Sequence, residues 1–476
     1  MRTNLSYVLV AMASAGLFAC GGGTGPSGAA PAATDDAGDT DSGPVTTPVE
    51  AGVAMEAAAP VDHGAPSSTY PAFPVSFGQL EDNGGYKMKA PVIVAITWTA
   101  DPSEAMFDAF ADTLGGTAYW TATAGQWGIG AATSGTVNHA QLTTAPPATL
   151  SETQSGSDFQ NLVTMYAGAA GGWPAPTEDT IYAFFVAPGT SVQLPNQQGT
   201  LQDACAQGIG GWHSDMTVGS VTTTYAVVAS CAFPGGNSAA QQTTMSMSHE
   251  INEAASDPQP DANLPGVTGF EDDSFAFDYF QDFQSEDGDA CEFFDTGADS
   301  SFYEDIETTP APFDYWVQRI WSNKSGAAGH NPCVPAPMDS YFNVTPLELQ
   351  TVKVANPQGS GGSSSSSTFN SKGYKILAGS SATFAVGFYS DAATSGPWTI
   401  HATAGNPVLG DQDFLAQYNK SSVSVSLDKT SGQNGEKANV TVKVASSGTL
   451  FKGEIVTITS SLNGVEHYMP IWINGQ

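Results

Sequence analysis

The spacing of apolar residues changes once along this chain of 476 residues, and that change most constrains its fold. Before a Gly- and Ser-rich stretch at 359–367, apolar runs typical of strands alternate with helical patterns. Beyond it, apolar and polar residues alternate with a period of two. Since such a stretch is typical of a flexible linker, the sequence predicts two regions of different class. These are residues 70–338 and 369–476, with 339–368 as the connecting segment.

The first region has the pattern of an α/β or α+β domain. Val92–Trp98 is a continuous apolar run rich in β-branched residues, which is typical of a strand covered on both faces. Residues 101–104 (DPSE) predict a helix start, and 159–166 has apolar residues at helical spacing. The runs 181–186 and 225–228 predict two more buried strands. Strands interleaved with helices indicate a layered fold.

The second region predicts an all-β domain. Its runs 383–388, 423–427 and 440–444 alternate apolar and polar residues, and Asn463 and Gly464 form a hairpin-turn pair between two further runs. Roughly seven short strands in a segment of this length fit an immunoglobulin-like β-sandwich. This stretch resembles the immunoglobulin-like modules of bacterial surface proteins.

The N-terminus has the pattern of an export signal. A basic start and an uncharged run predict a signal peptide at 1–19, and Cys20 directly after it resembles the lipidated cysteine of bacterial lipoproteins. An ordinary secretory signal with an unmodified cysteine is the alternative. Residues 20–69 are small and polar, which predicts a disordered tether. We therefore expect an exported protein at the outer membrane or surface of a Gram-negative bacterium, attached to the membrane only through its N-terminal lipid.

The remaining cysteines are even in number and predict two disulfides. Proximity along the chain favours pairing Cys205 with Cys231 and Cys291 with Cys333. A zinc cluster of all four is the rival interpretation, but the chain has no CxxC spacing to support it.

The charge balance excludes one class of partner. The chain has 13 Lys and Arg against 47 Asp and Glu, for a formal net charge of −34. Binding to a nucleic-acid backbone depends on clustered Lys and Arg, so we expect no nucleic-acid partner. Nothing in the sequence indicates an obligate oligomer.

A predicted helix at 243–256 contains the string His-Glu-Ile-Asn-Glu at 249–253. Residues four apart share a helix face, so His249 and Glu253 can bind one ion while Glu250 faces a water bound to it. This is the arrangement of HExxH metallopeptidases with the second His replaced by Glu, a zincin-like HExxE helix. The alternative is a solvated helix on which His249 and Glu253 merely pair.

An acidic segment follows the predicted helix. Between residues 271 and 307 there are 14 acidic residues, nine Phe or Tyr, and no Lys or Arg. So many aromatic residues indicate that the segment packs, and packed carboxylates need cations. We expect Asp289 as the third metal ligand, with Glu286 and Asp257 supporting the ligands. Zn²⁺ is the expected ion, and Ca²⁺ is the competitor because it binds oxygen ligands.

Four blocks carry a resemblance to a known family. They are, in chain order, 205–214 (CAQGIGGWHS), 248–258 (SHEINEAASDP), 286–292 (EDGDACE) and 317–323 (VQRIWSN). In this order they resemble motifs of the phosphate-induced, exordium-like secreted proteins. The resemblance covers about residues 90–338 and implies an exported domain. It also implies that family motif positions are matched by His213, His249, Glu250, Glu253, Glu286 and Asp289.

Two hypotheses of function follow. The first is a lipid-anchored, metal-dependent hydrolase, a peptidase acting on a peptide or cell-surface polymer, with Glu250 as general base. His213 would stabilise a transition state or complete the metal shell, although it can equally be a structural residue. The second is a non-catalytic surface or matrix-binding protein with structural Ca²⁺ in the acidic segment.

Overall fold

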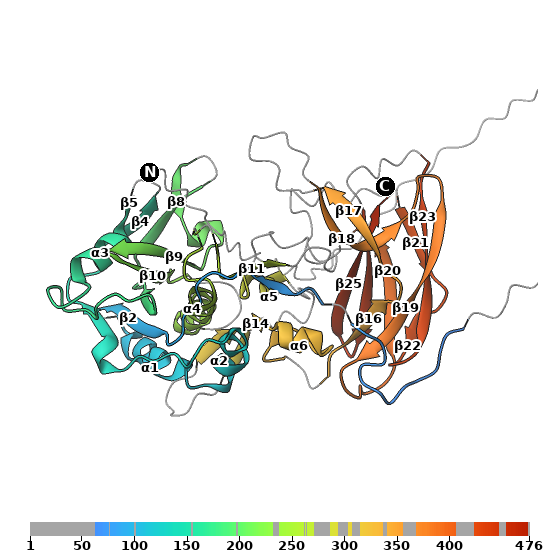
Figure 1. The fold of residues 1–476 in the computed structure, drawn as a ribbon, viewed down its shortest axis with the longest axis horizontal. Coiled ribbons are helices and arrows are strands. Elements are labelled where there is room, and N and C mark those ends of the chain that lie inside the picture. Colours follow the sequence, from blue (N-terminus) through green and yellow to red (C-terminus); the bar gives the residue numbers. More distant parts are fainter. Residues whose placement is uncertain are drawn as a thin grey trace, which may run out of the picture. The chain divides into compact units, whose positions relative to one another are not determined.

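A computed structural model describes most of the chain beyond residue 61. The residues described are 62–75, 77–99, 101–153, 156–196, 199–231, 238–260, 262, 264–270, 286–293, 303–306, 315–336, 340–355, 368–405, 423–446 and 454–474. They form a β-rich structure with several separate sheets and fewer helices (Figure 1). In this part of the chain, every helix is too short or too polar to cross a lipid bilayer.

A five-stranded sheet lies at the centre of the first region. Its strands are β2 (Val92–Trp98), β3 (His139–Leu142), β6 (Thr180–Phe185), β9 (Gly211–Val218) and β10 (Val221–Val228). The order is β3-β2-β6-β10-β9. The first four run parallel, and β9 is antiparallel to β10. Parallel strands are typically covered on both faces, which explains the continuous apolar runs in this part of the sequence.

Helices cover both faces of this sheet. In β2, Ile93 and Ala95 join a core with helices α1 (Glu104–Leu114) and α4 (Ala239–Ser256). Val94 and Ile96 point the other way and join a core with α3 (Asp158–Tyr166). Successive strand residues point to opposite faces, so one strand serves two cores.

Shorter elements complete this region. The remaining helices are α2 (Ala118–Ala122), α5 (Asp289–Phe293) and α6 (Asn323–Ala327). One four-stranded sheet contains β4 (Thr149–Thr153), β5 (Gly156–Ser157), β7 (Ser191–Pro195) and β8 (Leu201–Asp203). Three two-stranded pairs are β1 (Leu80–Asp82) with β11 (Val267–Phe270), β12 (Tyr303–Ile306) with β13 (Tyr315–Gln318), and β14 (Ile320–Trp321) with β15 (Cys333–Val334).

Helix α4 begins earlier than the sequence pattern predicts. Ser238 and Gln241 form a capping box, in which each side chain hydrogen-bonds to the other's backbone, and the helix ends before Asp257. Every residue from 242 to 256 is buried. One side packs on the central sheet, and β13 lies against another side, where Gln318 N donates to Ser248 Oγ at 2.9 Å. The alternative interpretation of this segment as a solvated helix is therefore wrong.

Two further sheets form the C-terminal region. The first, in the order β16-β19-β23-β21, contains β16 (Phe342–Pro346), β19 (Ser381–Ser390), β23 (Lys437–Val444) and β21 (Val423–Leu427). The second contains β17 (Gln350–Ala355), β18 (Thr368–Lys375), β25 (Val465–Asn474), β24 (Glu454–Leu462), β20 (Trp398–Ala404) and β22 (Ser431–Gly432), also in sheet order. The hairpin between β24 and β25 turns at Asn463 and Gly464, both with positive φ. Two-residue hairpin turns need such angles.

The two C-terminal sheets pack face to face through aromatic side chains. Trp398 lies 5.5 Å from Phe342 and 5.6 Å from Phe388 between ring centroids, and Tyr374 stacks on Phe384 at 3.8 Å. Each of these contacts joins one sheet to the other. We refer to the pair of sheets as the sandwich.

The sandwich begins before the predicted boundary. Strands β16 and β17 lie inside 339–368, the segment expected to be a connection, and pair with β19 and β18. The linker prediction at 359–367 falls outside the described residues. A Gly- and Ser-rich stretch therefore lies between two paired strands, β17 and β18, and does not separate two domains.

The chain also reaches the sandwich near its N-terminal end. Asn434 Nδ2 donates to the carbonyls of Ser67 and Thr69 at 3.0 and 2.8 Å, and Ala72 N donates to Asn434 Oδ1 at 3.1 Å. The last residues of the predicted tether are thus bound to the sandwich. The predicted signal peptide, Cys20 and the tether up to residue 61 lie outside the described residues.

Candidate metal centre

Helix α4 contributes three side chains to one buried cluster. His249, Glu250 and Glu253 are each at most 2% exposed. His249 Nε2 lies 2.9 Å from Glu253 Oε2, one helical turn away. The HExxE spacing therefore brings its first and last residues together, as the sequence predicts.

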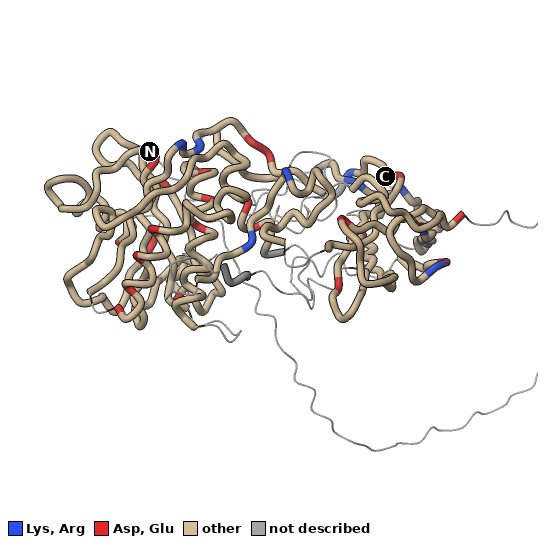
Figure 2. The backbone as a smooth tube through the Cα atoms, turned by 90° about the horizontal axis from the view of Figure 1, so that it is seen from below, with Lys and Arg blue, Asp and Glu red and all other residues tan. Residues whose placement is uncertain are grey.

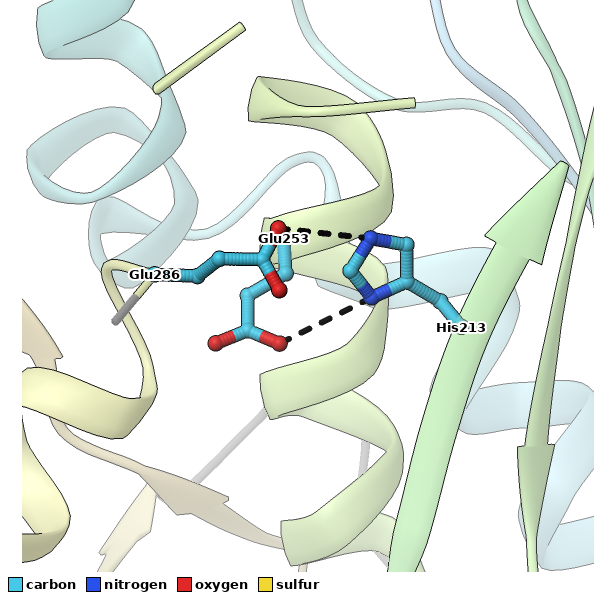
Figure 3. A group of neighbouring side chains, drawn as sticks. All are labelled: His213, Glu253 and Glu286. Carbon is cyan, nitrogen blue, oxygen red and sulfur yellow. Dashed lines mark ion pairs between the residues drawn. The ribbon is translucent and has the colours of Figure 1, made fainter. Parts of the chain in front are cut away.

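Strand β9 brings His213 to the same cluster. Because Trp212 packs into the core on the α3 side of the sheet, its neighbour His213 points to the opposite face, towards α4. His213 Nδ1 lies 3.6 Å from Glu250 Oε2 and 3.7 Å from Glu253 Oε2. Its Nε2 lies 3.5 Å from Glu286 Oε1, so each ring nitrogen faces a carboxylate (Figure 3).

The turn at 286–289 closes the cluster from a third direction. Gly288 N and Asp289 N both donate to Glu253 Oε1, at 3.1 and 3.2 Å. Asp289 Oδ1 lies 3.7 Å from His249 Nε2. These contacts fix the Glu253 carboxylate so that its other oxygen, Oε2, faces both histidines.

The sequence-predicted disulfide holds this turn in place. Cys291 is bonded to Cys333. Strand β14 links this disulfide to the turn, because Trp321 pairs with Cys333 and Trp321 N donates to Asp287 O at 2.8 Å. Gln318 Nε2 also donates to Gly288 O at 3.0 Å. The second predicted disulfide, Cys205–Cys231, is present as well. Both predicted pairings are confirmed.

Two glycines allow the backbone to approach the cluster closely. A Cβ on Gly288 would lie 2.7 Å from His249 Nδ1 and 2.8 Å from Glu253 Oε1. A Cβ on Gly211 would lie 2.6 Å from Glu250 Oε1. Real Cβ atoms essentially never come so close, so a Cβ at either site would displace the neighbouring side chains of the cluster. The sequence analysis missed both residues, although each lies within a block that it singled out.

Burial and charge together perturb the carboxyl groups. Burial, and then the Glu253 carboxylate, raises the pKa of Glu286 well above its ordinary value and that of Asp287 to about 7. Burial likewise raises the pKa of Glu250. Burial acts in the same direction on Glu253, but the neighbouring histidines outweigh it and lower the pKa. The protein alone therefore cannot keep all these carboxylates ionised.

The pKa of His213, in β9, is also shifted from its ordinary value. Burial lowers the pKa of His213, but the Glu250 and Glu253 carboxylates outweigh it, so the pKa lies above its ordinary value. Acidic residues far outnumber basic ones along the chain, as Figure 2 shows for the described part. The ion pairs of Glu250, Glu253 and Glu286 among the described residues all involve histidine.

The donor set fits a divalent metal ion. Both oxygens of Glu286 are buried and lack a hydrogen-bond partner within the described structure, as does Oε2 of Glu250. Ligand atoms of His249, Glu250 and Glu253 lie within 4.8 Å of one another. Mixed imidazole and carboxylate donors suit zinc or a similar transition metal, whereas calcium takes oxygen ligands.

The predicted site residues therefore lie together, with two differences in detail. Glu286, expected to support the ligands from outside, faces His213 directly and is itself a possible ligand. The Asp257 side chain accepts a hydrogen bond from Gly266 N at 2.8 Å, and its carbonyl oxygen lies 3.2 Å from His213 Nε2. The acidic stretch 271–285 lies outside the described residues.

Two neighbours of the cluster had no signal in the sequence. Trp127 Nε1 donates to Asp287 Oδ2 at 3.1 Å. Tyr119 OH accepts from Asn252 Nδ2 at 3.0 Å and donates to Gln318 O at 2.9 Å, which ties α4 to β13. Only the fold brings these two aromatic residues to the cluster.

Comparisons with known proteins add no relative. No family model, curated protein or solved structure matches this chain. The function must therefore be argued from the geometry of the centre.

Proposed function

We propose that this chain is an extracytoplasmic metal-dependent hydrolase, a peptidase with an HExxE site on a zincin-like helix. The observation that carries the proposal is the position of His249 Nε2, which lies 2.9 Å from Glu253 Oε2 and 3.7 Å from Asp289 Oδ1, with Glu250 one residue along the same helix. The order of four sequence blocks that resemble exordium-like secreted proteins supports an exported domain of this kind.

Each residue has a role in this proposal. His249, Glu253 and Asp289 would hold the ion, and Gly288 N and Asp289 N keep Glu253 oriented. A zinc ion bound there would polarise a substrate carbonyl and acidify water. Glu250 would accept the proton, since burial raises its pKa towards the range useful for a general base. His213, 3.6 Å from Glu250, would stabilise charge that develops beside it.

The rest of the chain suits work at a cell surface. The export signal and Cys20 support a lipid-anchored protein of the Gram-negative outer membrane or cell surface. We assign the sandwich to an immunoglobulin-like module, and the substrate to a peptide or cell-surface polymer. A chain with a formal net charge of −34 suits no nucleic-acid partner.

One observation favours a second candidate, a non-catalytic binding protein with a structural ion such as Ca²⁺. The candidate ligands His249, Glu253 and Glu286 are each at most 2% exposed. Structural metal sites are closed by protein ligands, whereas catalytic sites keep a position open for water or substrate.

The substitution Glu250→Gln separates the two candidates. Purified wild-type protein, Glu250→Gln and the exposed control Glu178→Gln are assayed with a fluorogenic peptide library, and bound metal is measured in each. We expect Glu250→Gln to retain its metal and lose at least about a hundredfold in hydrolysis, with the control unchanged. If Glu250→Gln and wild type hydrolyse the peptides equally, the hydrolase proposal is wrong and the binding protein is favoured. The same holds if the wild type binds metal but hydrolyses no peptide.

A further inference from the structure

The donor atoms of the centre fall into two groups that share Glu253. One group is His213, Glu253 and Glu286, and the other is His249, Glu250 and Glu253. Within each group, one ligand atom from every residue lies within 4.8 Å of the others. Each group offers an imidazole nitrogen and carboxylate oxygens, which are donors that suit a divalent ion. In the His249 group we assign Asp289 Oδ1, 3.7 Å from His249 Nε2, as the further ligand, and Glu250 keeps its role as general base.

The shared residue is placed to serve both groups. Glu253 Oε2 lies 2.9 Å from His249 Nε2 and 3.7 Å from His213 Nδ1, while Oε1 is held by two backbone N–H groups. In two-metal hydrolases the ions lie about 3.5–4 Å apart, close enough to share one ligand. We propose that the centre holds two divalent metal ions, with Glu253 shared between them.

The two histidines approach from separate elements, each with its own acidic partner. His213, on β9, has Glu286 at 3.5 Å from Nε2. His249, on α4, has Asp289 at 3.7 Å from Nε2. An ion assigned to His249, Glu253 and Asp289 therefore leaves His213 and Glu286 as a second pair of donors beside Glu253.

The buried oxygens of Glu286 also offer donors to a second cation. With one ion on the His249 side, Glu286 keeps two buried oxygens without a hydrogen-bond partner in the described part of the chain. A buried ionised carboxylate without compensation is costly, and an ion beside His213 and Glu286 provides the compensation. The proposal deepens the hydrolase assignment and rests on it for the presence of metal. Two-ion centres occur in aminopeptidases, so the proposal keeps a peptide amide as the substrate class.

Metal stoichiometry tests this proposal on the full exported chain. Metal-free protein is dialysed against buffered Zn²⁺, and bound zinc per chain is measured by inductively coupled plasma mass spectrometry. We expect about two Zn²⁺ in the wild type and about one in His213→Ala and in His249→Ala, with circular dichroism confirming that each variant is folded. His139→Ala is the matched control, because His139 lies outside the centre between Asp108 and Asp112, at 3.4 and 2.9 Å.

The outcomes are distinguishable from failure of the hydrolase proposal. One Zn²⁺ per chain in the wild type overturns the two-ion centre, as does an undiminished count in His213→Ala or a lost ion in His139→Ala. Two ions without hydrolysis support the centre and remove the hydrolase. Mn²⁺-loaded wild type gives a check that needs no variant: spin coupling in its electron paramagnetic resonance spectrum supports two neighbouring ions, and an uncoupled spectrum contradicts them.

Discussion

The interior around helix α4 and the interior of the sandwich are equally buried but chemically opposite. In the sandwich, the largest fully buried side chains are aromatic, among them Trp398 and Trp472. Asn343, its most deeply buried amide, donates to Tyr468 O at 3.2 Å and accepts from Ser460 Oγ at 2.9 Å. Around α4, the buried groups include Glu250, Glu253 and Glu286. The sandwich can be stable through its own packing, whereas each carboxyl group in the α4 interior must either be protonated or face a positive charge.

This difference suggests that the two regions contribute differently: the sandwich to stability and the α4 interior to chemistry. Apolar burial contributes roughly 25 cal/mol per Å² and demands no partner. Buried carboxylates cost free energy unless they are paired, so a fold that concentrates them keeps them for a purpose other than stability. Substitutions in the two interiors should therefore affect different measurements.

The largest expected effect is in the sandwich. Trp398 is fully buried and joins the two sheets through Phe342 and Phe388. Trp398→Ala should lower the free energy of unfolding by about 3–5 kcal/mol in urea denaturation, because it opens a cavity, while the metal content stays at the wild-type value. The exposed neighbour His401 provides the control, and His401→Ala should cost about 0.5 kcal/mol or less. A loss of metal in folded Trp398→Ala would contradict the claim that the two interiors affect different measurements.

A buried acid away from the metal centre should make stability depend on pH. Burial raises the pKa of Glu152 to about 7, against hydrogen bonds from Ser157 Oγ and Tyr225 OH that lower it. The folded protein therefore favours the protonated acid. Stability is fully present below pH 4.5 and falls as pH rises towards about 7, by roughly 3 kcal/mol.

The variant Glu152→Gln removes the titrating group and tests this slope. Urea denaturation between pH 4 and pH 8 should show a smaller loss of stability in Glu152→Gln than in wild type, with Glu178→Gln as the exposed control. At about pH 8 the variant should be the more stable protein. If the free energy of unfolding falls with pH equally in the variant and the wild type, the Glu152 carboxyl group does not cause the pH dependence.

A smaller effect is expected at Gly288. Because a Cβ there would collide with His249 and Glu253, Gly288→Ala should weaken metal affinity by about 10- to 100-fold while leaving the fold intact. Isothermal titration with Zn²⁺ measures the affinity. Gly156→Ala is the matched control, since no atom lies within 4 Å of the Cβ that it adds. Unchanged affinity in Gly288→Ala would show that the 286–289 turn does not define the centre.

Local sequence patterns predict the helices and strands of this chain, but they do not predict which of these elements contact one another. The apolar run of β2 and the helix start at 101–104 can be predicted from the sequence because both depend on neighbouring residues in the chain. The sandwich boundary was misplaced for the opposite reason. The pairing of β17 with β18 connects residues on either side of 359–367, and composition carries no information about strand partners.

The same distinction holds within the centre. His249 and Glu253 are predictable because they lie one helical turn apart. The approach of Glu286 to His213 depends on how β9, α4 and the disulfide-linked turn pack, which no local spacing encodes. The roles of Gly211 and Gly288 are visible only once the neighbouring side chains are placed.

Anomalous diffraction at the zinc edge, from crystals of the full exported chain grown with Zn²⁺, tests the central claim most directly. The claim is that the buried carboxylates around α4 bind a divalent metal ion. It predicts an anomalous peak about 2.0–2.3 Å from both His249 Nε2 and Glu253 Oε2. A map without a peak there, in which His249 and Glu253 stay in direct contact at the 2.9 Å found here, would contradict it.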